Sequence, residues 1–262
     1  MVEVISQTRY RFHDGFWSQE PAEVVREAPI TLWVNGREIA TIIATPNDIE
    51  ELICGFLAME GIIAQRSQIT IFQYHEDDQQ VWVRIPNANE ERLLHFARPT
   101  LSGCCGRGRP LLYFANDQDL APINGALTPH LSPATVTTLF SQLNQVTQQQ
   151  HSGGLHAAGV GSQDGALRVA RMDVGRHNAL DKVYGWSLIQ QEDIRSLIVV
   201  FSGRLSSEVL IKVARMGIGI VISNAAPTSL GIELATMLGI TTVGFVRSRE
   251  LSVYSYPERI QS

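Results

Sequence analysis

The feature that most constrains the fold is a regular alternation in the C-terminal third of the chain. Short apolar runs at 198–201, 218–223 and 240–246 are separated by helical segments at 206–216 and 227–238. Helices between successive strands imply parallel βαβ units. Strands in such a sheet are covered by helices on both faces. The alternation therefore predicts an α/β domain with a largely parallel sheet.

The first half of the chain has a different pattern. Asn35-Gly36 lies between two β-rich runs, 30–34 and 37–43, and predicts a hairpin with a type I′ turn. A helix is expected next, with Thr45 as its cap, Pro46 in its first turn and Asp48 in a variant of the capping box. A second pair of strands is expected at 69–75 and 80–85. This pattern predicts a small α+β unit.

Three segments follow from these patterns. Residues 1–28 are polar and mostly without periodicity, so we expect a loosely held N-terminal arm. Residues 29–130 form the predicted small α+β domain, which ends in a Pro-rich run typical of a linker. Residues 131–262 form the predicted α/β domain, which begins with a helix opened by Ser132-Pro133 and includes two strands around the Asp164-Gly165 turn.

Charge and hydropathy exclude several classes of function. The chain has 262 residues and a formal net charge of −5, which argues against a general nucleic-acid binder. No apolar run reaches the roughly 18 residues that span a bilayer, and the N-terminal residues have no apolar stretch typical of a signal peptide. Three cysteines are too few for a disulfide framework, and Cys54 falls beside the apolar face of the first helix as a small core residue. We expect an intracellular protein that contacts neither nucleic acid nor membrane.

Two adjacent thiols, Cys104 and Cys105, lie in a segment rich in Gly and Arg. Arg98, Arg107 and Arg109 flank them, and the nearest following acid is at position 117. Guanidinium groups favour the thiolate, which is the nucleophilic form of cysteine. Glycine gives the backbone freedom to bend. We interpret one of the two thiols as a nucleophile or sulfur carrier; the alternative is a surface loop with incidental thiols.

Polar residues gather where predicted strands of the α/β domain begin or end. In open α/β sheets, ligands bind outside the carboxyl ends of the strands, and helix N-termini favour anions. Ordinary N-capping also accounts for some of the hydroxyls, and a lone histidine is often structural. The candidate residues for a phosphorylated ligand are His156, Asp173, Arg176, His177, Lys182, Ser202, Arg204, Thr228, Ser229, Arg247 and Arg249.

Zinc is the main metal alternative. Its candidate ligands would be His95, Cys104, Cys105, His151 and His156. Adjacent cysteines do not match the C-x₂₋₄-C spacing of zinc sites, and the H-x-E and P-C-x-x-C motifs of zinc deaminases are missing. We therefore expect no stable metal.

Taken together, these motifs resemble the FdhD family of sulfur-carrier accessory proteins of formate dehydrogenase. The resemblance runs from about Pro29 to Ile260. It is carried by segments 52–63, 102–104, 154–158, 202–204, 226–230 and 253–260, and above all by the run Asp173-Val174-Gly175-Arg176-His177-Asn178-Ala179-Leu180-Asp181-Lys182.

The resemblance implies a fold and an assembly. The C-terminal domain would be a three-layer α/β domain like that of cytidine deaminases, without the deaminase zinc, beside the smaller N-terminal α+β domain. The protein would be a cytoplasmic homodimer.

The resemblance also implies an activity, that of a sulfurtransferase. A cysteine desulfurase would pass sulfane sulfur to a loop cysteine as a persulfide, and the sulfur would go to the molybdenum cofactor in its bis(guanine dinucleotide) form. The cofactor would then enter the catalytic subunit of formate dehydrogenase. The family loop commonly reads C-x-x-C; Cys104 matches its first cysteine, Arg107 stands in place of the second, and Cys105 is an auxiliary neighbour.

A guanine-nucleotide type of ligand is expected from the same resemblance. The family segment that contacts the cofactor falls on Val246, Arg247, Ser248, Arg249, Glu250 and Leu251. Arginine suits a phosphate-rich ligand because guanidinium pairs with phosphate bidentately. The leading hypothesis is therefore a sulfurtransferase acting on the molybdenum cofactor. The second is a non-catalytic chaperone for a nucleotide or for this cofactor, with incidental thiols.

Overall fold

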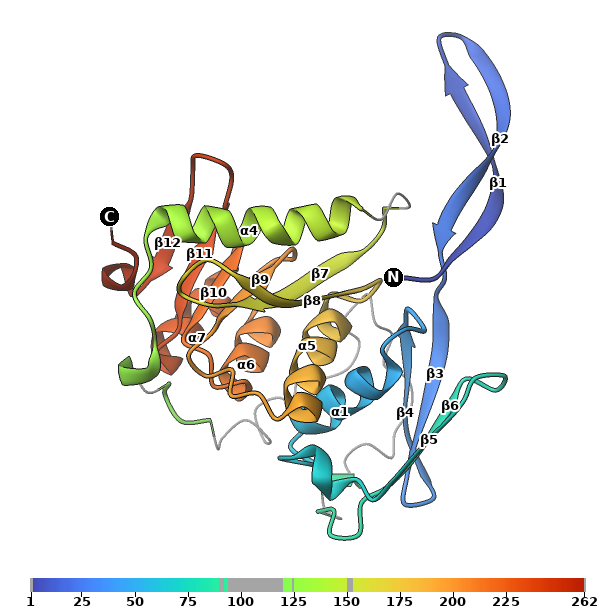
Figure 1. Cartoon of the computed structure of the whole chain (residues 1–262), viewed down its shortest axis with the longest axis horizontal. Coiled ribbons are helices and arrows are strands. Elements are labelled where there is room, and N and C mark those ends of the chain that lie inside the picture. Colours follow the sequence, from blue (N-terminus) through green and yellow to red (C-terminus); the bar gives the residue numbers. More distant parts are fainter. Residues whose placement is uncertain (1, 90–91, 94–119, 124, 150–152, 262) are drawn as a thin grey trace.

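The computed structural model describes residues 2–89, 92–93, 120–123, 125–149 and 153–261. In this part of the chain there are a six-stranded sheet, a four-stranded sheet and a two-stranded hairpin. The two larger sheets lie on opposite sides of a layer of helices, and the hairpin projects from the body (Figure 1). The thiol segment, with Cys104 and Cys105, lies outside the described residues.

The six-stranded sheet has the order β12-β11-β10-β9-β7-β8. Its strands are β7 (His156–Gly161), β8 (Leu167–Asp173), β9 (Ile198–Phe201), β10 (Ile220–Ser223), β11 (Thr241–Gly244) and β12 (Ser252–Ser255). Strands β9, β10 and β11 are parallel, as the alternation predicts. Strand β7 runs antiparallel to both β8 and β9, and β12 runs antiparallel to β11.

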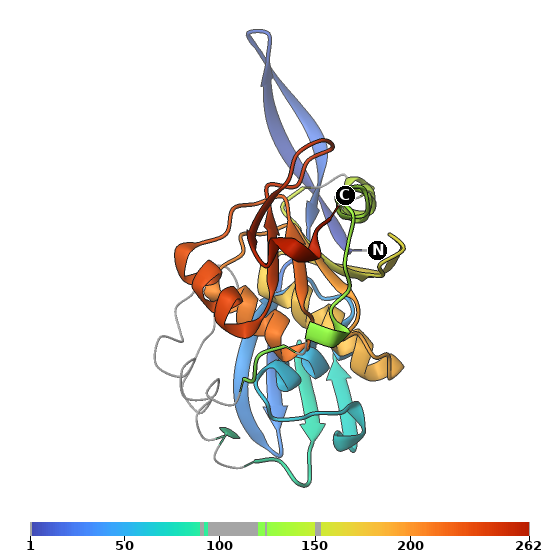
Figure 2. The same ribbon diagram turned by 90° about the vertical axis from the view of Figure 1, so that its left-hand side faces the viewer.

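Helices cover both faces of this sheet. Helix α4 (Pro133–Gln148) packs on one face through Val136, Leu139 and Leu143, and the Ser132 hydroxyl accepts a hydrogen bond from Thr135 N as its cap. Helices α5 (Arg176–Gln190), α6 (Ser207–Arg215) and α7 (Ser229–Leu238) cover the other face (Figure 2). Burial of each such Leu or Val stabilises the fold by roughly 1.5–3 kcal/mol. The predicted α/β arrangement is confirmed; the specific likeness to cytidine deaminases stays a prediction.

The four-stranded sheet has the order β4-β3-β6-β5. Its strands are β3 (Ala28–Val34), β4 (Arg37–Ala44), β5 (Ile71–His75) and β6 (Gln80–Arg84). Alternate residues of β3, namely Ile30, Leu32 and Val34, are fully buried against helix α1 (Ile49–Met59). The Asn35-Gly36 hairpin is confirmed, because both residues adopt the positive φ of a type I′ turn.

Helices α1 and α5 join the two larger sheets by an unusually close contact. A methyl group added to Gly55 of α1 would lie 1.8 Å from the carbonyl oxygen of Asp181, and one added to Gly185 of α5 would lie 1.8 Å from that of Glu51. Only glycine permits the two backbones to approach this closely. The pair Gly55 and Gly185 therefore fixes how the two halves meet.

The N-terminal arm differs from the expectation. Residues predicted to be loosely held form strands β1 (Val4–His13) and β2 (Phe16–Val25), which pair antiparallel along their whole length. The turn is Asp14-Gly15, and both residues have positive φ. The Asp-Gly dipeptide is typical of hairpin turns. It did not lead to a predicted hairpin, because many of the flanking residues are polar and they lack a clear strand pattern.

The start of helix α1 is also different. The helix begins at Ile49, after Asp48 in the left-handed conformation, and no side chain of the described residues caps it. Thr45 was the predicted cap, but its hydroxyl is buried and bonded to Asp173 instead. The described chain also contains the short 3₁₀ turns η1 (Arg66–Gln68), η2 (Gly125–Leu127) and η3 (Pro257–Arg259).

Candidate functional site at the strand ends

The candidate residues gather at one edge of the six-stranded sheet. Strand β8 is antiparallel to β7, which is antiparallel to β9, so β8 runs in the same direction as β9, β10 and β11. The carboxyl ends of all four strands therefore meet at one edge, together with the first residue of β7, His156. These candidate segments therefore lie along one edge of the sheet, and their contact with a ligand stays a prediction.

The centre of this edge contains polar atoms without partners. Arg176, the first residue of α5, packs beside Gly203, because a methyl group added there would lie 3.5 Å from Arg176 Cδ. Arg176 Nε, Ser206 Oγ and Asn224 Oδ1 are buried and have no hydrogen-bond partner in the described residues. Buried polar groups are nearly always bonded, so three such atoms at one edge make it the candidate ligand site.

The charge at this edge favours an anion. The N-termini of α5 and α6 both point there, and helix N-termini carry partial positive charge. Burial, and then the neighbouring Arg176 and His177, lower the pKa of His156, so its imidazole is neutral near pH 7. His177 Nε2 lies 3.0 Å from Glu208 Oε2, and this contact, more than any other, lowers the pKa of Glu208.

Asp173 and Lys182 have a different role from the one predicted. Lys182 Nζ lies 2.7 Å from Asp173 Oδ2, and both side chains are 0% exposed. Asp173 Oδ2 also accepts hydrogen bonds from the hydroxyl and the amide of Thr45, and Lys182 donates to that hydroxyl at 2.8 Å. Enclosed side chains with these partners cannot touch a ligand at the surface. The correction is that they join the β4–α1 connection to the sheet edge.

This buried joint also fixes the start of α5. Asp173 Oδ1 accepts hydrogen bonds from Gly175 N at 2.8 Å and from Asn178 Nδ2 at 2.9 Å, and Asn178 also donates to the carbonyl of Ile43. The carboxylate therefore orients the turn that presents Arg176. A buried, fully bonded ion pair is rigid, because moving either partner away would leave the other charge buried and uncompensated.

The segments after β10 and β11 form a second part of the edge, on the side of α4. A cavity of about 250 Å³ is lined by Thr137, Phe140, Ser141, Asn144, Asn224, Val246, Arg247 and Ser248. Arg247 Nη1 donates to the carbonyl oxygens of Asn224 and Val246. Ser223 Oγ donates to the carbonyl of Gly203, which ties this segment to the one after β9.

The other predicted contacts fall into two groups. Arg204, Ser229, Ser248, Arg249 and Glu250 are exposed at the edge. Several others are used by the fold.

Three of the predicted side chains have structural roles, and their contact with a ligand stays a prediction. Val246 is 1% exposed and packs in the core, the Thr228 hydroxyl caps α7 by accepting from Gly231 N, and the Ser202 hydroxyl accepts from Ala157 N. Leu251 is half-buried against the same core as Val246.

Two further residues lie at this edge of the sheet. The carboxylate of Glu208 contacts the imidazole of His177. No local motif identifies Glu208, because an acidic residue in the first turn of a helix such as α6 is common. Phe245 has a φ of 52° and is 44% exposed, directly before the predicted segment at 246–251. A bulky residue in the left-handed region is strained, and such strain is a reason to suspect function.

The third cysteine is not a candidate carrier. Cys54 is fully buried on α1, as its place beside an apolar face predicts, and burial raises the pKa of its thiol to about 12. A thiol with that pKa is protonated near pH 7 and is a poor nucleophile. The reactive candidates are therefore Cys104 and Cys105.

In the described residues, three or more His, Cys, Asp or Glu side chains do not come together as a metal site. Of the zinc candidates, only His156 belongs to that part of the chain. Among the helices described, none has both the length and the apolar character needed to cross a membrane.

The fold and the edge of the six-stranded sheet define an α/β protein with an anion-favouring candidate site at the carboxyl ends of its strands. Comparison with known proteins then gives the family. The model of the FdhD/NarQ family matches residues 25–261, so the chain belongs to this family.

Individual relatives agree over nearly the full length. The sulfur carrier protein FdhD of Bacillus pumilus is 39% identical over 253 residues, which cover 96% of this chain and 95% of the relative. The protein of the same name from Staphylococcus aureus is 37% identical over 258 residues, which cover 98% of this chain and 96% of the relative. A crystal structure from Desulfotalea psychrophila, described as a "putative formate dehydrogenase accessory protein", is 27% identical, covers 98% of this chain and 99% of its own, and has a TM-score of 0.77.

Proposed function

We propose that this protein is a sulfur carrier that serves the maturation of a formate dehydrogenase. Its relatives carry the names sulfur carrier protein and formate dehydrogenase accessory protein over almost the whole chain. The observation that supports this role most directly is the set of unpartnered polar atoms of Arg176, Ser206 and Asn224 at a positively polarised sheet edge. An edge of that kind suits a phosphate-rich molecule.

The proposed sulfur step is an exchange at Cys104. The thiolate attacks the sulfane sulfur of a persulfide on a cysteine desulfurase, the S–S bond of the donor breaks, and the donor thiolate leaves. Cys104 then carries the persulfide, and Cys105 is an auxiliary thiol. Arg98, Arg107 and Arg109 favour the thiolate that the exchange requires.

The proposed acceptor is the molybdenum cofactor in its bis(guanine dinucleotide) form, which is cargo on its way to the dehydrogenase. Its phosphates would meet the N-termini of α5 and α6, with Arg176 and Arg247 as cations. Neutral His156 would donate or accept a hydrogen bond there without adding charge. The protein itself is proposed to act in the cytoplasm.

Activity of the client enzyme tests the role of the thiol. Cys104→Ser should abolish formate dehydrogenase activity in cells that depend on this chain, while Cys54→Ser, on the buried thiol, should keep it. If Cys104→Ala retains full activity while Arg247→Ala and Arg249→Ala lose it, the protein is instead a chaperone with incidental thiols.

A further inference from the structure

The N-terminal hairpin exposes apolar side chains on both of its faces, and Phe16 lies on the face opposite Phe12 and Trp17. The β1–β2 register puts Tyr10, Phe12 and Trp17 on one face and the bonded pair Arg9 and Glu20 on the other. The three aromatic side chains are 68%, 59% and 71% exposed. A two-stranded ribbon is at best marginally stable in water, and contiguous exposed apolar groups indicate a partner surface.

The tip of this hairpin adds an apolar and an acidic group. Phe16, the first residue of β2, is 79% exposed. The side chain of Asp14 in the turn is 85% exposed, and its neighbour in the described chain is the equally solvated imidazole of His13, at 3.3 Å. The tip therefore offers an aromatic ring and a carboxylate side by side.

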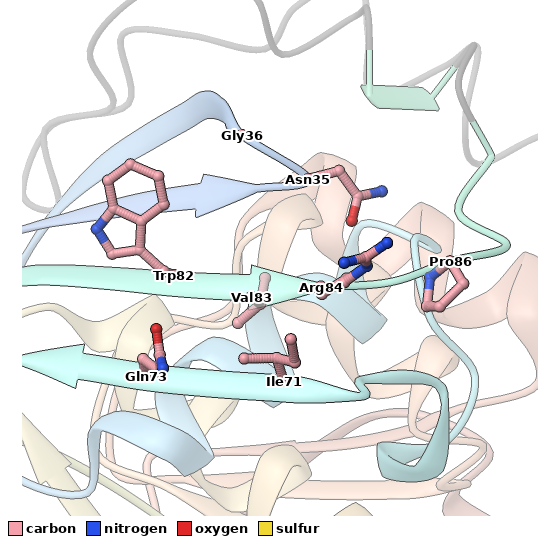
Figure 3. A pocket seen from close by; sticks show the side chains of 8 residues that line it. All are labelled: Asn35, Gly36, Ile71, Gln73, Trp82, Val83, Arg84 and Pro86. Atoms are coloured by element: carbon pink, nitrogen blue, oxygen red, sulfur yellow. The ribbon is translucent and has the colours of Figure 1, made fainter.

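A pocket with the complementary chemistry lies on the outer face of the four-stranded sheet (Figure 3). Its volume is about 460 Å³, and its apolar walls include Ile71, Trp82 and Pro86. Arg84 is the charged residue in its lining, and no carboxylate of the described residues forms an ion pair with it. The pocket therefore suits an apolar group next to an anion.

The walls of this pocket are preformed. Trp82 stacks on Trp33 with ring centroids 4.7 Å apart and planes within 3°. The Asn35 side chain at the rim donates to the carbonyl of Ile85 and accepts from its amide, both at 2.8 Å. A rigid pocket with an exposed indole and a guanidinium has the residue types that dominate binding energy at protein interfaces.

The tip of one molecule cannot reach its own pocket. Strand β3 continues away from the hairpin, so the tip and the Asn35-Gly36 turn lie at opposite ends of the molecule (Figure 1). At about 3.3 Å per residue, ten residues of β2 and seven of β3 separate them by tens of ångströms. A hairpin tip that occupies this pocket must therefore come from another molecule.

We propose that the hairpin tip of one copy docks in the Trp82 pocket of a second copy. Phe16 packs against Trp82 and Ile71, and the carboxylate of Asp14 pairs with Arg84. A two-fold axis midway between tip and pocket brings both tips to both pockets at once, which gives a closed dimer with two identical contacts. This assigns an interface to the homodimer that the resemblance only implies, and it does not depend on the sulfur chemistry.

Cross-linking locates the contact directly. A photo-reactive benzoylphenylalanine at position 16 is introduced in the full chain, which is mixed with ¹⁵N-labelled protein so that links between copies can be told from links within one. Mass spectrometry should place the links between copies in residues 71–86. Links to another hairpin or to the six-stranded sheet instead would overturn the proposal.

The dimer dissociation constant, measured by analytical ultracentrifugation, gives a second test. Phe16→Ala should raise it at least about tenfold, as expected for an interface anchor. Arg84→Gln and Asp14→Asn should each raise the dissociation constant of the dimer. Because both substitutions remove the same contact, the double variant should have a dissociation constant no higher than that of the more strongly affected single variant. Asp14→Asn keeps a residue that tolerates the left-handed turn.

Matched controls are Arg168→Gln on the exposed surface of β8 and Asp77→Asn in the β5–β6 turn, which should leave the constant unchanged. Additive effects of Arg84→Gln and Asp14→Asn, or a wild-type chain that stays monomeric at all concentrations, would contradict the docking.

Discussion

At the scale of single residues, the molecule separates side chains that hold the structure from those that are open to a ligand. Asp173 and Lys182 belong to the most distinctive run of the sequence, yet they are sealed in an ion pair, and Thr45 completes it from the other half of the chain. Arg176, three residues after Asp173, has a buried Nε atom without a hydrogen-bond partner in the part of the chain that the structure describes. The run therefore combines a buried joint with the turn that presents Arg176 at the sheet edge.

The joint predicts a large loss of stability on removal of one charge. Lys182→Met leaves the carboxylate of Asp173 buried and uncompensated, so the free energy of unfolding should fall by about 3–5 kcal/mol. Urea unfolding followed by circular dichroism measures this change. Arg168→Met on the exposed surface is the control, and a loss below about 1 kcal/mol for Lys182→Met would refute the joint.

His156 gives a prediction on pH. Burial lowers the pKa of His156 in the folded protein, so the unfolded chain takes up a proton first as pH falls. Its contribution to stability is intact above about pH 6.5, the ordinary value, and is lost as pH falls from there through the lowered pKa. His156→Gln should flatten this part of the stability curve, and a slope unchanged in the variant would contradict it.

The same histidine can report on the ligand. A phosphate bound at the sheet edge stabilises the imidazolium, so saturating GDP should raise the pKa of His156. An NMR pH titration with and without GDP measures it, and Arg176→Gln should reduce the effect. A pKa of His156 that GDP leaves unchanged would argue against a nucleotide at this edge.

At the scale of elements, the contact between α1 and α5 decides how the two halves are held. The helices meet backbone to backbone at Gly55 and Gly185, with a buried bond between Lys212 and Asp181 on the other side of α5. A bidentate pair between Arg171 and Glu51 adds a link from α1 to β8. Small residues at this crossing are therefore required by geometry.

Gly55→Ala should separate the helices and lower the free energy of unfolding by about 1–3 kcal/mol or more, as overpacking does. Gln190→Ala at the exposed end of α5 is the control and should have little effect. Chemical denaturation of both variants measures the free energy of unfolding. If that of Gly55→Ala equals that of the wild type, the two helices can move apart without a loss of stability.

Local signals predicted the elements that depend on local physics. The Asn35-Gly36 turn, the Ser132 cap and the alternation after residue 198 are each written in a few neighbouring residues, and all are confirmed. The bond between Thr45 and Asp173 spans 128 positions, so no local pattern could predict it. The N-terminal hairpin was missed because its strands mix polar and aromatic residues rather than forming apolar runs.

At the scale of the whole molecule, the chain divides its tasks between two sheets. The six-stranded sheet presents an anion-favouring edge where the strand ends of β8, β9, β10 and β11 meet. The four-stranded sheet and hairpin present apolar and charged groups of complementary kind at opposite ends. The thiols at Cys104 and Cys105 belong to the segment that lies between the two sheets in sequence.

The most direct test of the central claim is the mass of the protein after incubation with a cysteine desulfurase and free cysteine. A gain of about 32 Da, mapped to Cys104 and removed by a reductant, is the predicted result. Cys104→Ser should lose the gain, whereas Cys54→Ser should keep it. If wild-type protein gains no sulfur, or gains it equally when Cys104 and Cys105 are both replaced by serine, this chain is not a sulfur carrier.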